Sequence, residues 1–266
     1  MAATSLSIYQ AHRDTLLAEI VSALSANESL IASWLTGSFA RHEADAVSDL
    51  DLNIVVADHY SESLCARPRL IGAGTTDERL AIISRFGQPA VIHENHHNAP
   101  EGGTFTFVLY KESALMVDWI FIPQAKAQRP AQSILLFDKA GIPVSPPGSP
   151  EALDQRVEML TEKIAFFWMV MAVTTKYVVR QDATQVQILL DTLQRVFYEI
   201  QRLIAGEFWR YRRGSTTRLC VNRDQQIKAL LELRNAMLNL IPQAVELGVQ
   251  VSSSPSSTLN VLLNLQ

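Results

Sequence analysis

The amino-acid sequence predicts an α+β protein in which a domain with a mixed sheet and helices comes first and a bundle of helices follows. Short apolar runs separated by turn-rich segments fill the first half, and apolar residues at helical spacing fill the second half. A segment rich in proline and glycine lies between them. A chain of 266 residues is long enough for two domains that each bury a core.

One helical pattern and several short apolar runs follow one another in the first half. The helical pattern covers 11–24, and the apolar runs are 31–35, 50–56, 105–110, 115–122 and 134–137. Runs of this length between breakers such as Gly72-Ala-Gly74 and the segment 98–103 are typical of strands. This half is therefore predicted to be α/β or α+β.

The pattern changes at residues 141–150, which contain four prolines and two glycines. Such a segment is typical of a linker, so we predict one domain over 1–145 and a second over 146–266. In the second domain, apolar residues recur at helical spacing over 157–170, 189–200 and 230–240. These three stretches predict a bundle of helices.

Composition and charge exclude several classes of protein. The net charge of −4 disfavours a dedicated nucleic-acid binder, because phosphate contacts require a surplus of basic residues. Cys65 and Cys220 form neither a disulfide framework nor a zinc-type spacing, which favours a reducing compartment. Charged residues interrupt the first 26 residues, and the most apolar run, 164–173, is about half the roughly 20 residues of a membrane-spanning helix. We therefore expect a cytoplasmic protein with no membrane segment.

Two alternating carboxylates, Asp49 and Asp51, follow a turn of small residues after the apolar run 31–35. Residues two apart on a strand point to the same side, so both carboxylates would project together while Leu50 and Leu52 anchor the opposite face. Like charges this close are unfavourable unless a cation lies between them, and carboxylate oxygens suit a hard ion such as Mg²⁺. The pair predicts a magnesium site; the alternative is an exposed strand end that happens to carry two aspartates.

Three further residues complete the predicted site. Gly37 allows the backbone to approach an anion, and the amides after it, with the Ser38 hydroxyl, can donate hydrogen bonds to phosphate oxygens. Asp118 interrupts the otherwise apolar run 114–123. Burying an unpaired carboxylate is unfavourable, so we expect Asp118 to meet a metal ion or a reacting proton.

These parts, in this order, resemble the signature of the DNA polymerase β-like nucleotidyltransferase superfamily. That signature has an apolar residue, Gly-Ser, a spacer of about ten residues, two alternating acidic residues and a third on a later strand. The chain is most similar to the bacterial aminoglycoside and lincosamide nucleotidyltransferases, which join this catalytic domain to a C-terminal helical domain. His42 departs from the pattern, because many relatives have glycine after the arginine that corresponds to Arg41.

The resemblance implies the residues of an active site. The implied catalytic residues, which are also the implied ligands of two Mg²⁺ ions, are Asp49, Asp51 and Asp118. The residues implied at ATP, or at another nucleoside triphosphate, are Gly37, Ser38, Arg41, Ser48, Lys176 and Arg180. The last two are four residues apart and would share one face of a helix; a solvated basic turn that complements the helix dipole is the alternative.

The implied reaction transfers AMP from ATP to a hydroxyl group of a small molecule, such as an aminoglycoside or lincosamide antibiotic, and releases pyrophosphate. The acceptor would enter between the domains, and Asp118 would take its proton. Two alternatives remain: transfer of the nucleotide to a protein, as in related enzymes that modify toxin partners, and a nucleotide-binding regulatory module without turnover. Whether a homodimer completes the cleft stays open.

Two other motifs suggest different chemistry. His93-Glu-Asn-His-His97 matches the zinc-protease pattern His-Glu-x-x-His, but that chemistry needs a helix, and the strand-like Val91-Ile92 before it and the turn residues after it disfavour one. We expect a polar loop, with Glu94 or a histidine lining the acceptor pocket as the alternative. Trp209-Arg-Tyr-Arg-Arg213 alternates aromatic and basic residues, which suits base stacking, phosphate binding or a plain surface loop.

Overall fold

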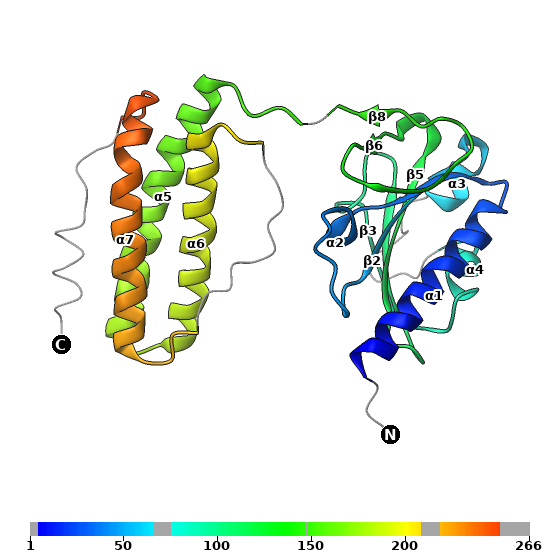
Figure 1. The fold of residues 1–266 in the computed structure, drawn as a ribbon, viewed down its shortest axis with the longest axis horizontal. Coiled ribbons are helices and arrows are strands. Elements are labelled where there is room, and N and C mark those ends of the chain that lie inside the picture. Colours follow the sequence, from blue (N-terminus) through cyan, green and yellow to red (C-terminus); the bar gives the residue numbers. More distant parts are fainter. Residues whose placement is uncertain (1–4, 66–75, 147, 209–218, 251–266) are drawn as a thin grey trace. The chain divides into compact units, whose positions relative to one another are not determined.

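The chain divides into two compact units, residues 1–147 and 148–266 (Figure 1). The computed structural model describes residues 5–65, 76–146, 148–208 and 219–250. The division lies inside the proline- and glycine-rich segment, whereas the sequence placed it after residue 145. Each unit has its own hydrophobic core, so each is a folded body in its own right.

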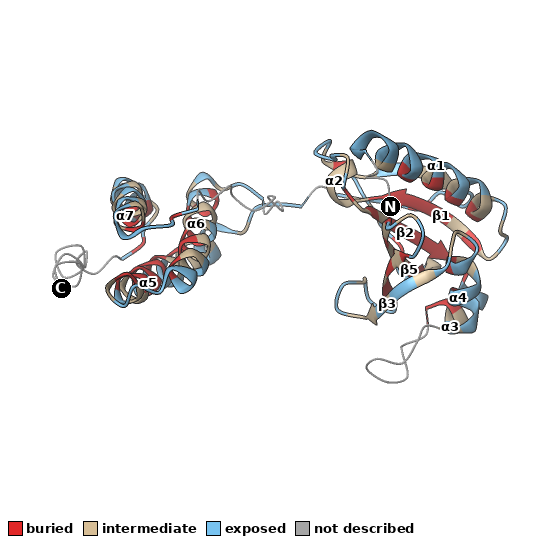
Figure 2. Ribbon diagram, turned by 90° about the horizontal axis from the view of Figure 1, so that it is seen from below, coloured by how far each residue is buried: buried red, intermediate tan, exposed pale blue. Residues whose placement is uncertain are grey.

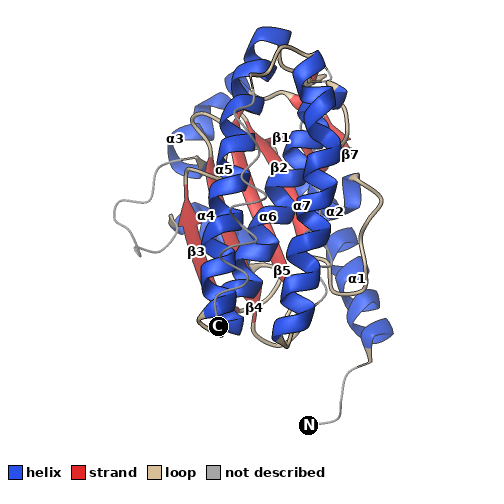
Figure 3. Ribbon diagram, turned by 90° about the vertical axis from the view of Figure 1, so that its left-hand side faces the viewer, coloured by secondary structure: helices blue, strands red, loops and turns tan. Residues whose placement is uncertain are grey.

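The first unit is built on a six-stranded mixed sheet (Figure 3). Its strands lie in the order β3-β4-β5-β2-β1-β7; β2 and β5 are parallel, and the other neighbours are antiparallel. A separate pair, β6 and β8, is parallel. The strands are β1 Leu30–Leu35, β2 Leu50–Val56, β3 Pro89–Asn95, β4 Thr104–Tyr110, β5 Met116–Pro123, β6 Arg129–Pro130, β7 Ile134–Asp138 and β8 Val144–Ser145. The predicted α+β fold with a mixed sheet is confirmed.

Short and long helices connect the strands of the first unit. They are α1 Leu6–Ser25, α2 Gly37–Ala40, α3 Ser61–Leu64 and α4 Asp77–Ser84, with short 3₁₀ turns at Asp58–Tyr60 and Gln124–Lys126. All five predicted apolar runs are strands, and the predicted helix is α1. The sequence missed α4 and most of β3, because the apolar signal of both is short and interrupted by charged and polar residues.

The two faces of the sheet differ in what covers them. On one face, Leu16, Ile20 and Leu24 of α1 and Ile83 of α4 pack against buried residues of β2 and β5. On the other face, a smaller cluster joins residues of β1, β2 and β5 to Ala127 and Ile142. Figure 2 shows the central strands β1, β2 and β5 as largely buried. Because strand side chains alternate, every second residue of β2 and β5 lies on the face opposite α1.

The second unit contains three long helices, α5 Leu153–Val179, α6 Ala183–Ala205 and α7 Arg223–Glu246. These correspond to the three helical stretches expected from the sequence. Asp182 and Asn222 accept hydrogen bonds from amides of the first turns of α6 and α7, and Gly206 ends α6 in the left-handed conformation. Apolar residues of all three helices form one core.

The segment His93–His97 is not a helix, so it cannot present two histidines as a zinc protease does. Our expectation of a polar loop was also wrong for its first part, because His93, Glu94 and Asn95 belong to β3. Alternation places Glu94 on the face that carries α4, where Arg79 donates to Oε1 at 3.0 Å and to Oε2 at 2.8 Å. Thr106 donates a third hydrogen bond at 2.8 Å. Glu94 is therefore part of the core and not of an acceptor pocket.

We predict that Glu94→Ala destabilises the protein by about 3–5 kcal/mol, because it leaves the fully buried Arg79 without its carboxylate. The matched control is Glu101→Ala, which breaks the exposed pair with Lys126 at 3.1 Å and should change stability by less than about 1 kcal/mol. Chemical denaturation of both variants measures the difference. Equal losses would contradict the assignment of Glu94 to the core.

Candidate active site

Three carboxylates meet at one end of the strands β2 and β5. Asp51 and Asp118 are direct partners in the parallel register of these strands, so their side chains leave the sheet on the same face. Asp49 lies two residues before Asp51, just before β2 begins. One carboxylate oxygen from each of the three lies within 4.8 Å of the other two. The structure thus brings together the three aspartates that the sequence selected.

Burial and mutual repulsion shift the acidity of this cluster. Burial, followed by the charges of Asp51 and Asp49, raises the pKa of Asp118 to about 7. Burial and the charge of Asp49 raise the pKa of Asp51 to about 6, against a smaller lowering effect of Arg41. Within the described residues, Oδ1 of Asp118 is buried without a hydrogen-bond partner. The cluster therefore gathers several carboxylate oxygens, and one of them still lacks a partner. Oxygen atoms of this kind are the ligands that a hard divalent cation prefers.

Gly37 makes room for the carboxylate of Asp51. The glycine has a φ of +61°, in the left-handed region that side chains disfavour. A Cβ atom on Gly37 would overlap Oδ2 of Asp51, so no other residue fits here without moving the carboxylate. The sequence suggested that Gly37 admits an anion; the anion that it admits in this structure is the side chain of Asp51.

Thr36, just before Gly37, joins the turn that contains this glycine to β2 at Asp51 and Asn53. The backbone amide of Thr36 donates to the carbonyl of Asp51 at 3.0 Å, and the side-chain amide of Asn53 donates to the Thr36 hydroxyl at 2.9 Å. Helix α2 begins at Gly37, and the first amides of a helix have no acceptor within the helix. The Ser38 hydroxyl oxygen is buried and has no hydrogen-bond partner among the described residues. The predicted phosphate-binding donors therefore lie beside the carboxylates.

Arg41 and His42 end this turn. Arg41 donates to Glu43 at 2.9 Å, and its charge is close enough to lower the pKa of Asp51. His42 has a φ of +58°, so the departure from glycine noted in the sequence falls on a left-handed residue. A non-glycine residue in this conformation costs about 1 kcal/mol, and the backbone adopts it nevertheless.

Ser48 closes the loop that leads to Asp49. Its hydroxyl donates to Oδ1 of Asp45 at 2.9 Å and accepts from the amide of Asp45 at 2.8 Å. Ser48 is buried, whereas Asp45 is exposed. The structure gives Ser48 a role in shaping the loop, while its contact with a nucleotide stays a prediction.

Arg13 of α1 supports the same loop and was missed by the sequence analysis. Its Nη1 donates to the carbonyls of Asp45 and Ser48 at 2.6 and 3.2 Å. A signal was present, because Arg13 continues the buried stripe of α1 that includes Leu16, Ile20 and Leu24. A charged residue in such a stripe needs a buried partner, but the sequence does not say which one.

Lys176 and Arg180 lie at the end of α5, in the second unit. Lys176 Nζ is 5.0 Å from the centre of the Tyr177 ring, and the Arg180 guanidinium carbon is 5.6 Å from it. The two basic residues are thus neighbours, as expected from their spacing. Their predicted contact with a triphosphate stays a prediction, and the segment Trp209–Arg213 lies outside the described residues.

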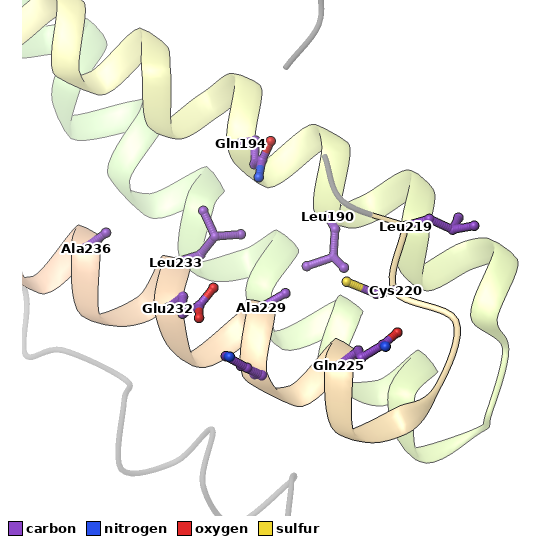
Figure 4. A pocket seen from close by; sticks show the side chains of 10 residues that line it. Leu190, Gln194, Leu219, Cys220, Gln225, Ala229, Glu232, Leu233 and Ala236 are labelled. Atoms are coloured by element: carbon purple, nitrogen blue, oxygen red, sulfur yellow. The ribbon is translucent and has the colours of Figure 1, made fainter. Parts of the chain in front are cut away.

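A cavity of about 450 Å³ lies in the second unit between α6 and α7 (Figure 4). Apolar side chains such as Leu190 and Leu233 face it, and Gln194, Lys228 and Glu232 also line it. Its volume suits a small molecule. No sequence motif pointed to it, and none of the predicted site residues lines it.

Comparison with known proteins does not identify a family. No protein-family model matches the chain, and no curated protein matches it either. Among the described helices, none has both the length and the apolar character needed to cross a membrane. The case for a function therefore depends on the geometry of the carboxylate cluster and its surroundings.

We predict that Gly37→Ala disrupts the carboxylate cluster, because the new Cβ atom displaces Asp51. The control is Gly141→Ala, at a φ of +70° with no atom within 4 Å of the new Cβ. The control should lose about 1–2 kcal/mol of stability from the backbone alone. Calorimetric titration with Mg²⁺ should show weakened binding for Gly37→Ala only. Unchanged binding in both variants would contradict the role of Gly37.

The raised pKa values predict how stability depends on pH when divalent cations are chelated. Both pKa values lie above the ordinary 3.8, so the folded chain binds more protons than the unfolded chain. This stabilisation is fully present below the unfolded pKa and is lost as the pH rises through about 6 to 7. We expect Asp118→Asn to gain melting temperature relative to the parent as the pH rises from about 4 to about 8. A constant difference in melting temperature over that range would contradict the assignment.

Proposed function

We propose that this chain is a magnesium-dependent nucleotidyltransferase of the DNA polymerase β-like type. The observation that carries the proposal is the convergence of Asp49, Asp51 and Asp118 beside the turn that begins at Gly37. Adjacent parallel strands hold two of the carboxylates in register, and the turn of the phosphate-binding motif contacts one of them. A metal site alone would not need this turn, and a phosphate-binding turn alone would not need three converging carboxylates.

The residues of the cluster fit Mg²⁺ in number, charge and donor type. Three carboxylates supply the oxygen ligands that this ion prefers, and its charge would offset their mutual repulsion. The buried, unpartnered Oδ1 of Asp118 is an atom that still needs a partner. When bound, Mg²⁺ would neutralise the negative charge of the triphosphate and of the leaving pyrophosphate.

We assign roles to the chain's own residues from their positions. The Ser38 hydroxyl, which has no partner among the described residues, and the first amides of α2, which have no acceptor within the helix, bind phosphate oxygens. Asp118 accepts the proton of the acceptor hydroxyl, because its carboxylate leaves the sheet on the same face as that of Asp51 and its buried Oδ1 has no partner among the described residues. The acceptor oxygen then attacks the α-phosphorus, and pyrophosphate leaves. Arg41 offsets part of the negative charge around Asp51.

The nucleotide and the acceptor are proposed from the family resemblance. We propose ATP as the donor of AMP and a hydroxyl-bearing small molecule, such as an aminoglycoside or lincosamide antibiotic, as the acceptor in the cytoplasm. Nucleotide transfer to a protein and nucleotide binding without turnover are the competing outcomes of the tests below. Among them, the intact set of three carboxylates favours turnover, because a module that only bound the nucleotide would not need a proton acceptor.

We predict that Asp49→Asn and Asp51→Asn each lower pyrophosphate release by about a hundredfold or more, because each removes an anionic oxygen from the cluster. The matched control is Asp77→Asn on α4, an exposed aspartate at a helix start, which should retain the parent's rate. A coupled pyrophosphate assay and calorimetric Mg²⁺ titration measure turnover and binding separately. Near-normal turnover in both active-site variants would refute the proposal.

Screening for the acceptor separates the competing functions. Pyrophosphate release is measured with each nucleoside triphosphate and Mg²⁺ in the presence of aminoglycosides, lincosamides or protein fractions. We expect release with a small hydroxyl-bearing acceptor. If the nucleoside triphosphate is radiolabelled, label transferred to protein would instead indicate a protein acceptor. Nucleotide binding without pyrophosphate release would indicate a regulatory module.

A further inference from the structure

We propose that Arg13, which belongs to none of the active-site motifs, is the positioning residue that sets the Asp49 carboxylate in the cluster. This inference rests on the proposed function, because it assigns a role at the same metal site. Arg13 lies on α1, and its residue is only 4% exposed. Among the described residues of the first unit, the other buried arginine is Arg79, which lies in α4 and pairs with Glu94.

The contacts of Arg13 converge on the loop just before Asp49. Nη1 donates to the carbonyl of Asp45 at 2.6 Å and to the carbonyl of Ser48 at 3.2 Å. The carbonyl of Ser48 belongs to the peptide group whose nitrogen is that of Asp49. A hydrogen bond to it fixes the orientation of this peptide plane, and therefore the direction in which the Asp49 side chain leaves the backbone.

The remaining atoms of the Arg13 guanidinium also have partners. Nε and Nη2 donate to Oδ1 of Asp14 at 3.2 and 3.1 Å, and the guanidinium carbon lies 4.7 Å from the centre of the Phe39 ring. Phe39 follows Ser38 in α2. One guanidinium therefore joins the loop of the metal ligands to the turn of the phosphate-binding motif. A lysine ammonium cannot make this planar set of contacts.

Asp49 needs such support more than the other two carboxylates do. The register of β2 with β5 begins at Leu50, so Asp51 and Asp118 are fixed by the sheet while Asp49 lies just outside it. One carboxylate oxygen from each of the three aspartates also lies within 4.8 Å of the other two, so the ionised groups repel one another. Repulsion would turn an unsupported Asp49 away from the cluster. The bond from Arg13 opposes that movement through the backbone.

The test compares Mn²⁺ binding, measured by electron paramagnetic resonance on the full chain, in Arg13→Met, Arg13→Lys and Leu24→Ala. Leu24 lies at the other end of α1 and is 2% exposed, so its variant loses packing of the same helix without touching the loop. We expect Arg13→Met to weaken Mn²⁺ binding by about tenfold to a hundredfold and Arg13→Lys by less. Leu24→Ala should lower the melting temperature without changing Mn²⁺ affinity.

Hydrogen exchange of the amides at residues 45–49 supplies a second readout. Faster exchange in Arg13→Met than in Leu24→Ala supports the inference, and parent-like Mn²⁺ affinity in a folded Arg13→Met overturns it. If Arg13→Met does not fold, the comparison of Arg13→Lys with Leu24→Ala decides in the same way. A parent chain that binds no Mn²⁺ would refute the proposed function itself, whereas parent binding with no effect of Arg13 refutes this inference alone.

Discussion

The mutual repulsion of three carboxylates is the constraint on which the first unit is organised. Asp49, Asp51 and Asp118 are held with oxygens within 4.8 Å of one another, and burial together with the neighbouring negative charges raises the pKa of Asp51 and of Asp118. The core on the other side of the sheet makes this proximity tolerable, because Leu50, Leu52, Val117 and Trp119 bury the alternate positions of the same strands. Apolar packing on one face of the sheet therefore keeps the three carboxylates close together on the other face.

Small and polar groups around the cluster make room for the carboxylates or fix the backbone that carries them. Gly37 gives the Asp51 carboxylate the space that a Cβ atom would occupy, and Thr36 ties the glycine turn to the Asp51 carbonyl. Arg13 ties the neighbouring loop to α1. These contacts of Thr36 and Arg13 are made to backbone carbonyls near the carboxylates and do not use the carboxylate oxygens. The site is thus preorganised by its supports, which is the arrangement that electrostatic catalysis needs.

The two units differ in the kinds of side chains that they bring together. The first unit gathers titratable groups with strongly shifted pKa values at one place, and such gatherings are typical of functional sites. The second unit has a continuous apolar core, a cavity between α6 and α7, and the basic pair Lys176 and Arg180 around Tyr177. Its features suit binding rather than bond making. We therefore propose the first unit as the place of the reaction chemistry.

The sequence by itself determined the features that depend on local periodicity: the five apolar strands, the three long helices and the alternation that projects Asp49 and Asp51 together. It also selected Asp118, as a charge in an apolar strand. Only the tertiary structure decided that Asp118 is the register partner of Asp51, that Asp51 itself fills the space left by Gly37, and that Glu94 pairs with Arg79 and not with a metal. Arg13 belongs with these, because the two carbonyls that it binds, those of Asp45 and Ser48, lie more than thirty residues away. Strand pairing and burial bring distant residues together, and no local pattern encodes which ones will meet.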